Sequence, residues 1–330
     1  MTGHPTADEA NQETCRVGGK RTIMATAVYS HSDCLLHEMG RGHPECPERL
    51  VSIDDQLIAS RIAEFVERES APLADIDDLA RVHTRAHIDF VERSAPREGH
   101  AWLDPDTAMN PHTWQAALRA AGAAVAATDA VIDGRYDNAF CSVRPPGHHA
   151  EPARAMGFCF FNNVAIAARH ALEVRGLSRV AVVDFDVHHG NGTEAAFAGD
   201  ERVLMCSFFQ HPFYPFSGAD NQAPNMLNLP MPARTTGSAV REAIDLVWLP
   251  RLEAFKPEMI FISAGFDAHR EDDLGNMGLV EDDYTWITDQ VRRIAERYAR
   301  GRIVSCLEGG YNLSALGRSV VAHVRALAGI

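Results

Sequence analysis

The chain has 330 residues, of which 46% are hydrophobic and 23% are charged, so it can form one large α/β domain with a substantial core or two ordinary domains. Its net charge of -14 argues against nucleic acid or an anionic membrane surface as a partner and favours cationic ligands. No apolar run approaches the roughly 18 residues that span a bilayer, and the polar N-terminus lacks the apolar centre of a signal peptide.

The predicted elements alternate along the chain. We expect a loose leader at residues 1–20 and a single domain at 21–330, because no repeat, low-complexity block or long linker interrupts the sequence. Apolar runs predict strands at 21–30, 138–143, 179–186, 202–208, 258–267 and 302–310, and amphipathic stretches predict helices at 43–60, 112–132, 164–176, 239–255 and 282–300. This alternation is typical of a parallel sheet with helices on both faces.

The seven cysteines are scattered, and none forms a CxxC pair. They predict buried free thiols in a reducing compartment, and with the absence of a basic targeting run they favour the cytoplasm. Five residues of metal-ligating types also fall within 16 positions near the N-terminus, but their spacing lacks a paired-ligand pattern and predicts no structural zinc site: His31, Cys34, His37, His43 and Cys46.

Reactive side chains follow four of the predicted strands. NAFCSV continues into RPPGHH, RVAVVDFD continues into VHHGNG, EMIFISAGFD stops on Asp267, and RIVSCLEGG is followed by Tyr311. Ligands bind at the carboxyl ends of the strands in parallel α/β sheets. We therefore expect these four segments to converge on one site.

The segment DFDVHHG predicts a metal site. Asp184, Asp186 and His188 are spaced two apart, so Asp186 and His188 can hold one cation from an extended chain, with Asp267 as third ligand. Two carboxylates and one imidazole suit catalytic zinc, and they also suit Fe²⁺. An isolated D-x-H triplet is common and is more typical of ordinary strand-end acids and loop-capping histidines than of a metal site, so the prediction depends on the convergence.

The adjacent residues His148 and His149 are candidates for general-base catalysis near pH 7. Each needs an orienting acceptor, and Asp184 and Asn191 are the candidates. Tyr311 follows two glycines, so its phenol can reach a tight site and stabilise an oxyanion. Turn histidines and a tyrosine packed over a loop remain the alternatives when each motif is considered alone.

Together, RPPGHHA, DFDVHHGNG, GFDAHREDDLG and LEGGYN resemble the zinc-dependent deacetylases of the arginase–deacetylase fold. The form is similar to class II histone deacetylases and the bacterial histone deacetylase-like amidohydrolases. The resemblance includes HSDCLLHEMGRGHPECPERL and covers roughly residues 22–325. It implies a single-domain α/β fold with an eight-stranded parallel sheet and helices on both faces.

The resemblance also implies roles for individual residues. It implies zinc on Asp186, His188 and Asp267, with His149 as general base and Tyr311 as the phenol that polarises the acyl carbonyl. His148 becomes a charged neighbour that is hydrogen-bonded to Asp184. The other implied positions are the substrate-tunnel residues Phe158, Tyr214, Gly157 and Leu274, a potassium site at Asp184 and Ser207, and Arg49 near the acetate exit.

The sequence departs from the commoner family pattern at three places, of which the loop bears on the substrate. Asn191 stands where class I enzymes have aspartate, Tyr214 replaces the commoner phenylalanine, and the loop SFFQHPFYPFSG is short and similar to that of acetylpolyamine amidohydrolases. Leu274 is typical of lysine deacetylases, whereas the polyamine-selective branch carries an acid there. The neighbouring acids Glu271, Asp272 and Asp273 form either an acidic rim or a solvated loop.

The sequence therefore predicts a zinc-dependent amidohydrolase that removes acetyl or other acyl groups from lysine side chains in peptides or proteins and is inhibited by hydroxamates. The alternative at the same site is an acetylpolyamine amidohydrolase. A binuclear manganese ureohydrolase would need more carboxylates around DFDVHHG, and a non-catalytic acyl-lysine binding module would more easily have lost Tyr311 or a histidine. A homo-oligomer remains open.

Overall fold

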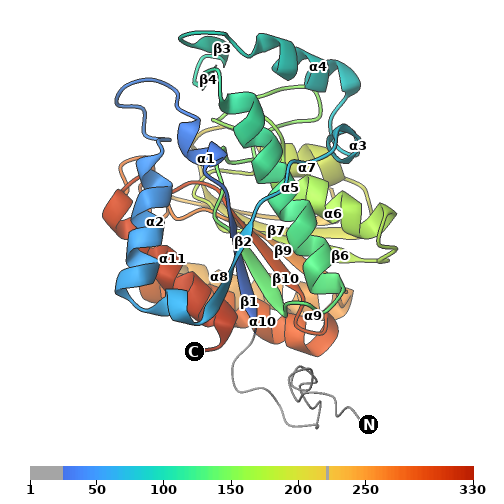
Figure 1. The fold of residues 1–330 in the computed structure, drawn as a ribbon. Coiled ribbons are helices and arrows are strands. Elements are labelled where there is room, and N and C mark those ends of the chain that lie inside the picture. Colours follow the sequence, from blue (N-terminus) through green and yellow to red (C-terminus); the bar gives the residue numbers. More distant parts are fainter. Residues whose placement is uncertain (1–24, 221–222) are drawn as a thin grey trace, which may run out of the picture.

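The computed structural model describes residues 25–220 and 223–330. The predicted leader at 1–20, Cys15 and the start of the predicted strand 21–30 lie outside these residues. An eight-stranded, all-parallel sheet forms the centre of the molecule (Figure 1), as the sequence predicts. In spatial order its strands are β2 (Val66–Ser70), β1 (Thr26–Ser30), β5 (Asn138–Cys141), β10 (Ile303–Leu307), β9 (Met259–Ala264), β6 (Val180–Asp184), β7 (Val203–Gln210) and β8 (Met226–Met231).

The sequence predicted six of these strands and missed the two at the sheet edges. The inner strands are continuous apolar runs because both of their faces are buried. In β2 only Val66 is fully buried, and β8 contains Pro230, which an edge strand tolerates because it needs fewer ladder hydrogen bonds. Edge strands therefore lack the pattern by which the central strands were found.

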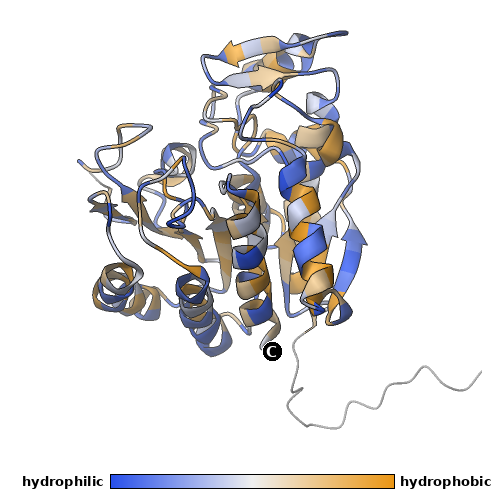
Figure 2. Ribbon diagram, turned by 90° about the vertical axis from the view of Figure 1, so that its left-hand side faces the viewer, coloured by the Kyte–Doolittle hydropathy of each residue, from blue (hydrophilic) through white to orange (hydrophobic). Residues whose placement is uncertain are grey.

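Helices cover both faces of the sheet (Figures 1 and 2). On one face α5 (Thr113–Ile132) and α6 (Asn163–Glu173) pack together and against the central strands. On the other face α10 (Glu281–Tyr298) contacts β9, α11 (Leu313–Ala328) contacts β5, and α2 (Glu48–Ala59) packs on α11. The shorter helices are α1 (Asp33–Leu36), α3 (Ile76–Leu79), α4 (Arg85–Ser94), α7 (Asn191–Phe197), α8 (Gly237–Ala243) and α9 (Leu249–Phe255).

Four of the five predicted helices are single helices in the structure, α2, α5, α6 and α10, and the fifth is divided. The predicted helix at 239–255 is α8 and α9 joined by a π-helical turn at Ile244–Trp248. The sequence prediction omitted the short helices α1, α3, α4 and α7 and the long helix α11. The ends of α11 are well defined: the Asn312 side chain accepts a hydrogen bond from the Ala315 N–H, and Gly329 ends the helix in the left-handed conformation.

The sheet and its helices enclose a large hydrophobic core, to which the inner strands contribute almost completely buried side chains. Burial of this apolar surface is the main force that holds the layers together. The six described cysteines are free thiols, and all except Cys46 are buried, as predicted. Within 25–220 and 223–330, no helix has the length and apolar character needed to cross a membrane.

The strand order determines where the site forms. The four strands β5, β10, β9 and β6 are consecutive neighbours in the sheet, although they are far apart in the chain. Because all of them are parallel, the segments that follow them emerge at the same edge. A small hairpin of β3 (Ala101–Asp104) and β4 (Thr107–Met109) lies beyond one end of the sheet, together with α4 (Figure 1).

Candidate active site

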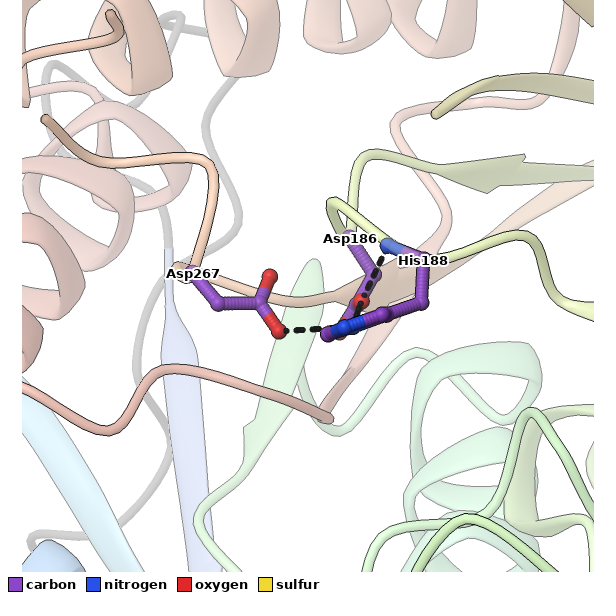
Figure 3. Close-up of side chains that lie close together, drawn as sticks. All are labelled: Asp186, His188 and Asp267. Carbon is purple, nitrogen blue, oxygen red and sulfur yellow. Dashed lines mark hydrogen bonds and ion pairs between the residues drawn. The ribbon is translucent and has the colours of Figure 1, made fainter. Parts of the chain in front are cut away.

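Two carboxylates and one imidazole meet at the carboxyl ends of β6 and β9 (Figure 3). The Nδ1 atom of His188 lies 3.1 Å from Oδ1 of Asp186 and 3.2 Å from Oδ2 of Asp267. One potential ligand atom from each residue lies within 4.8 Å of the others. Both aspartates are fully buried, and the His188 side chain is 12% exposed. The structure thus brings together the three residues that the sequence singled out as a metal site.

The chemistry of this cluster fits a divalent cation. Burial and the adjacent Asp186 raise the pKa of Asp267 to about 7, because two buried carboxylates repel each other. The buried Oδ2 atom of Asp267 accepts no hydrogen bond, and Nδ1 of the His188 ring lies 3.2 Å from it. A cation among these atoms would offset the repulsion and satisfy that oxygen.

Two glycines allow the carboxylates to lie against the backbone. A Cβ atom on Gly265 would fall 2.0 Å from Oδ2 of Asp186, and one on Gly309 would fall 2.0 Å from Oδ2 of Asp267. The Gly309 N–H also donates to Oδ2 of Asp186 at 2.8 Å. Glycine is therefore required at both positions for the carboxylates to keep this arrangement.

The two adjacent histidines have different partners. The Nδ1 atom of His148 lies 3.0 Å from Oδ2 of Asp184, and Nδ1 of His149 lies 2.8 Å from Oδ1 of Asn191, with the rings 4.0 Å apart. Burial opposes charge on both rings, but Asp186 and Asp184 raise the pKa of His148 well above its usual value. Burial and the charged neighbour His148 lower the pKa of His149 well below its usual value. The pair therefore combines one cationic and one neutral imidazole.

The loop that carries these histidines is held by a residue that the sequence reasoning missed. The buried Glu308, which directly follows β10, accepts hydrogen bonds at Oε2 from the Gly147 N–H (2.6 Å) and the His148 N–H (3.0 Å). Its Oε1 atom accepts from the Ser263 hydroxyl at 3.2 Å. The sequence did carry a signal for this role, because Glu308 directly follows an apolar strand and is therefore expected to be buried. A buried acid needs hydrogen-bond donors around it.

A second buried cluster holds the tyrosine loop. Glu45 forms ion pairs with Arg49 and Arg144, and although burial opposes its charge, Arg144 holds the pKa of Glu45 well below its usual value. Arg49 donates to Glu45 Oε1 (3.0 Å), to the Gly310 carbonyl (2.7 Å) and to the Glu308 carbonyl (2.5 Å). All three guanidinium nitrogens of Arg49 thus bond to protein atoms, and its cation lies 5.0 Å from the centre of the Tyr311 ring. Its predicted place near an acetate exit stays a prediction.

A pocket of about 240 Å³ opens onto the cluster. The sequence predicted seven of its lining residues: His149, Gly157, Phe158, His188, Tyr214, Leu274 and Tyr311. Of the other three, Asp273 was anticipated as a possible rim acid, Phe213 lies in the quoted loop SFFQHPFYPFSG but was not singled out, and Asp106 lies outside every quoted motif. The Phe213 ring stacks on the imidazole of His188 with the ring centres 5.4 Å apart, so it covers one face of that side chain.

The three acids after Asp267 point in different directions and do not form one rim. Glu271 is exposed and forms an ion pair with Arg318. Asp272 is 5% exposed and accepts backbone hydrogen bonds. Asp273 is exposed and lines the pocket.

The predicted potassium position and the histidines and cysteines of 31–46 do not line this pocket. Ser207 lies beside Asp184 on the neighbouring strand, and its buried hydroxyl has no hydrogen-bond partner, so an oxygen is available there for the predicted potassium ion. The histidines and cysteines of 31–46 do not come together as a ligand group. His37 is hydrogen-bonded to Thr113, and its Nε2 atom lies 3.4 Å from a Glu45 oxygen. Within 25–220 and 223–330, the cluster at Asp186 is the one group of metal-ligating side chains that meets.

Comparisons with known proteins agree with this geometry. The sequence matches the family model described as histone deacetylase domain over residues 43–327. It is 38% identical to the histone deacetylase-like amidohydrolase of Pseudomonas aeruginosa over 88% of this chain and 78% of that protein. It is 37% identical to type-2 histone deacetylase 2 of Dictyostelium discoideum over 93% of this chain, but spans only 21% of that much longer protein. The solved structure titled HDA15 HD domain superposes with a TM-score of 0.87 at 34% identity, covering 93% of this chain and 90% of that one.

Proposed function

This chain belongs to the histone deacetylase family and is an amide hydrolase, and we propose that its substrate is an acyl-lysine side chain in a peptide or protein. The observation that carries the proposal is the convergence of a metal-ligand cluster, a neutral histidine and a phenol at one pocket. Hydrolysis of an unactivated amide needs a polarised carbonyl, a base for water and an acid for the leaving amine. This pocket has a group for each task.

We propose zinc as the metal, held by Asp186, His188 and Asp267. Zinc bound there would supply Lewis-acid chemistry at the acyl carbonyl. The same oxygen and nitrogen donors suit Fe²⁺, so metal reconstitution must include both ions. Asp184 and the unpaired hydroxyl of Ser207 would hold potassium.

We propose that His149 is the general base. Its Nδ1 atom is bonded to Asn191, which leaves Nε2 to take a proton from the attacking water and to return it to the leaving amine. The lowered pKa of His149 keeps the ring neutral and able to accept a proton. His148, charged beside it, would stabilise the negative charge that develops on the acyl group.

We propose that the Tyr311 hydroxyl donates a hydrogen bond to the acyl carbonyl oxygen. Burial and the nearby Asp267 raise the pKa of Tyr311 well above its usual value, so the phenol keeps its proton at neutral pH. A donor held in place before the reaction stabilises the oxyanion as it forms.

The pocket walls support a linear alkyl chain. Phe158, Tyr214 and Leu274 surround the approach to the cluster, and a lysine side chain is an unbranched chain that such walls accept. The carboxylates of Asp106 and Asp273 also line the pocket, and they favour a second candidate, an acetylated polyamine with a further ammonium group. The free thiols support the reducing cytoplasm as the location that we propose.

The experiment that tests the proposal compares substrates on metal-free protein and on protein reconstituted with zinc or Fe²⁺. An acetyl-lysine peptide, N-acetylputrescine and N8-acetylspermidine are assayed in parallel, with and without a hydroxamate. We expect metal-dependent, hydroxamate-sensitive turnover with the peptide preferred. Preference for the polyamines would refute the proposed acyl-lysine substrate. Detectable peptide binding without turnover would indicate a binding module. Unchanged turnover in Tyr311→Phe or His149→Ala would refute the residue roles.

A further inference from the structure

We propose that Asp272 is a positioning residue that sets the place of the Tyr311 phenol through the backbone. The inference rests on the proposed function, because it assumes that Tyr311 polarises the acyl group. Asp272 does not line the pocket, so it is not itself a catalytic residue.

Both carboxylate oxygens of Asp272 are used to fix the backbone. Oδ2 accepts from the Tyr311 N–H at 2.6 Å and from the Asn312 N–H at 2.9 Å, and Oδ1 accepts from the Leu274 N–H at 2.9 Å. Hydrogen bonds to a carboxylate are about twice as strong as neutral ones, and burial of this group strengthens them further. One side chain thus holds both the peptide unit before Tyr311 and the peptide unit before the tunnel residue Leu274.

The contact between the two segments is reciprocal. The Asn312 side chain donates from Nδ2 to the Glu271 carbonyl at 2.9 Å, while its Oδ1 accepts from the Ala315 N–H and caps α11. The segment that leaves metal ligand Asp267 and the segment that enters α11 are therefore bonded in both directions. The Asp272 contacts lie before the helix and act in addition to the cap.

The side chain of Tyr311 has few other restraints. Its ring contacts the Arg49 cation at 5.0 Å and the edge of Phe158 at 5.9 Å. These contacts orient the ring, whereas the peptide unit before it is held on its N–H side by Asp272 and on its carbonyl side by Arg49, which donates to the Gly310 carbonyl at 2.7 Å. Because the ring is rigid, a shift of the backbone N–H by about 1 Å moves the hydroxyl by a similar amount, and such a misplacement can lower a rate about 100-fold.

The test uses Asp272→Asn in the full chain reconstituted with zinc. The asparagine amide keeps the size of the carboxylate but removes its charge. It also replaces one accepting oxygen with an NH2 group, which cannot accept hydrogen bonds from the backbone N–H groups. Glu271→Gln is the matched control, since Glu271 is the preceding acid and its side chain is paired with Arg318 outside the pocket. We expect kcat on an acetyl-lysine peptide to fall about 10- to 100-fold in Asp272→Asn, with KM within about 3-fold and one zinc per chain, and about wild-type kcat in the control.

Two further readouts separate a positioning role from a general structural one. In the Tyr311→Phe background, Asp272→Asn should lower kcat less than about 2-fold, because the group it positions is already gone. A trifluoroacetyl-lysine peptide has a more electrophilic carbonyl and needs less polarisation. The defects of Asp272→Asn and Tyr311→Phe should therefore shrink in parallel on that substrate.

An undiminished effect of Asp272→Asn in the Tyr311→Phe background would overturn the inference, as would loss of zinc or an unchanged kcat. If Asp272→Asn does not fold, Asp272→Glu replaces it in the same cycle, because it keeps the charge and shifts the two amides. A wild-type chain that hydrolyses neither the acetyl nor the trifluoroacetyl peptide would refute the proposed function itself. If the wild-type chain turns over the peptides but the effects of Asp272→Asn and Tyr311→Phe on kcat add in the double variant, only the role of Asp272 is refuted.

Discussion

Substitution Gly265→Ala is expected to weaken metal binding strongly while leaving the fold in place. The added Cβ would lie 2.0 Å from Oδ2, 2.4 Å from Cγ and 2.5 Å from Cβ of Asp186, all atoms of one metal-ligand candidate. Real Cβ atoms essentially never lie closer than 3.0 Å to such heavy atoms. The Asp186 oxygen at 2.0 Å must therefore move away by at least 1.0 Å.

The size of that shift determines the effect. Metal–ligand distances vary by only about 0.2 Å in functional sites, so a displacement of about 1 Å removes Asp186 from the coordination sphere. The shift also disrupts the hydrogen bonds that Asp186 accepts from the N–H groups of His188 and Gly309. We expect zinc affinity and kcat/KM to fall at least about 100-fold. Overpacking should lower the free energy of unfolding by only about 1–3 kcal/mol.

The assay is zinc titration against a competing chelator, with metal content per chain and urea unfolding measured on the same samples. Gly278→Ala is the control, because a Cβ there meets nothing closer than 3.4 Å and should change neither zinc affinity nor activity. A Gly265→Ala protein that binds zinc with wild-type affinity and stoichiometry would refute the argument that glycine is required beside the carboxylate.

Three other substitutions test separate parts of the site and the core. Asn191→Asp gives His149 an anionic partner and should raise its pKa, so the acidic limb of kcat/KM against pH should move to higher pH; an unmoved limb would contradict the assignment of the base. Burial lowers the pKa of His323 to about 3 from 6.5, so its contribution to stability is complete above pH 6.5 and is lost as the pH falls. Wild type should lose about 2 kcal/mol more than His323→Gln between pH 7 and 5 in urea unfolding, and equal losses would show that this ring titrates normally. Asp273→Asn should reduce the preference for acetyl-lysine peptides with flanking arginines over matched neutral peptides about 3-fold at low salt, and an unchanged ratio would show that this carboxylate does not face the substrate.

The sequence was sufficient to predict the sheet and the convergence of the motifs, because central parallel strands are continuous apolar runs whose carboxyl ends share one edge. Asp186, Asp267 and Tyr311 could be anticipated from chain positions alone, since each follows such a run. The two edge strands were missed because their half-exposed sequences resemble loops.

The residues that hold the site in place could not be predicted in the same way. The hydrogen bond from the Gly147 N–H to Glu308 joins positions 161 residues apart, and the sequence around neither residue indicates that the two are paired. Asp272 was grouped with its acidic neighbours, although burial separates its role from theirs. Hydrogen bonds between side chains and distant backbone depend on tertiary packing, which periodicity does not encode.

The position of β10 has a consequence for biosynthesis. Although β10 is the last strand in the chain, it lies between β5 and β9 and joins the group β2, β1 and β5 to the group β9, β6, β7 and β8. During vectorial synthesis both groups therefore present an unpaired inner edge until Ile303–Leu307 has left the ribosome. A nascent chain stalled before that point has two partial sheets, each with an exposed edge that can pair with other chains. Such a chain should depend on holding chaperones far more than the finished protein does.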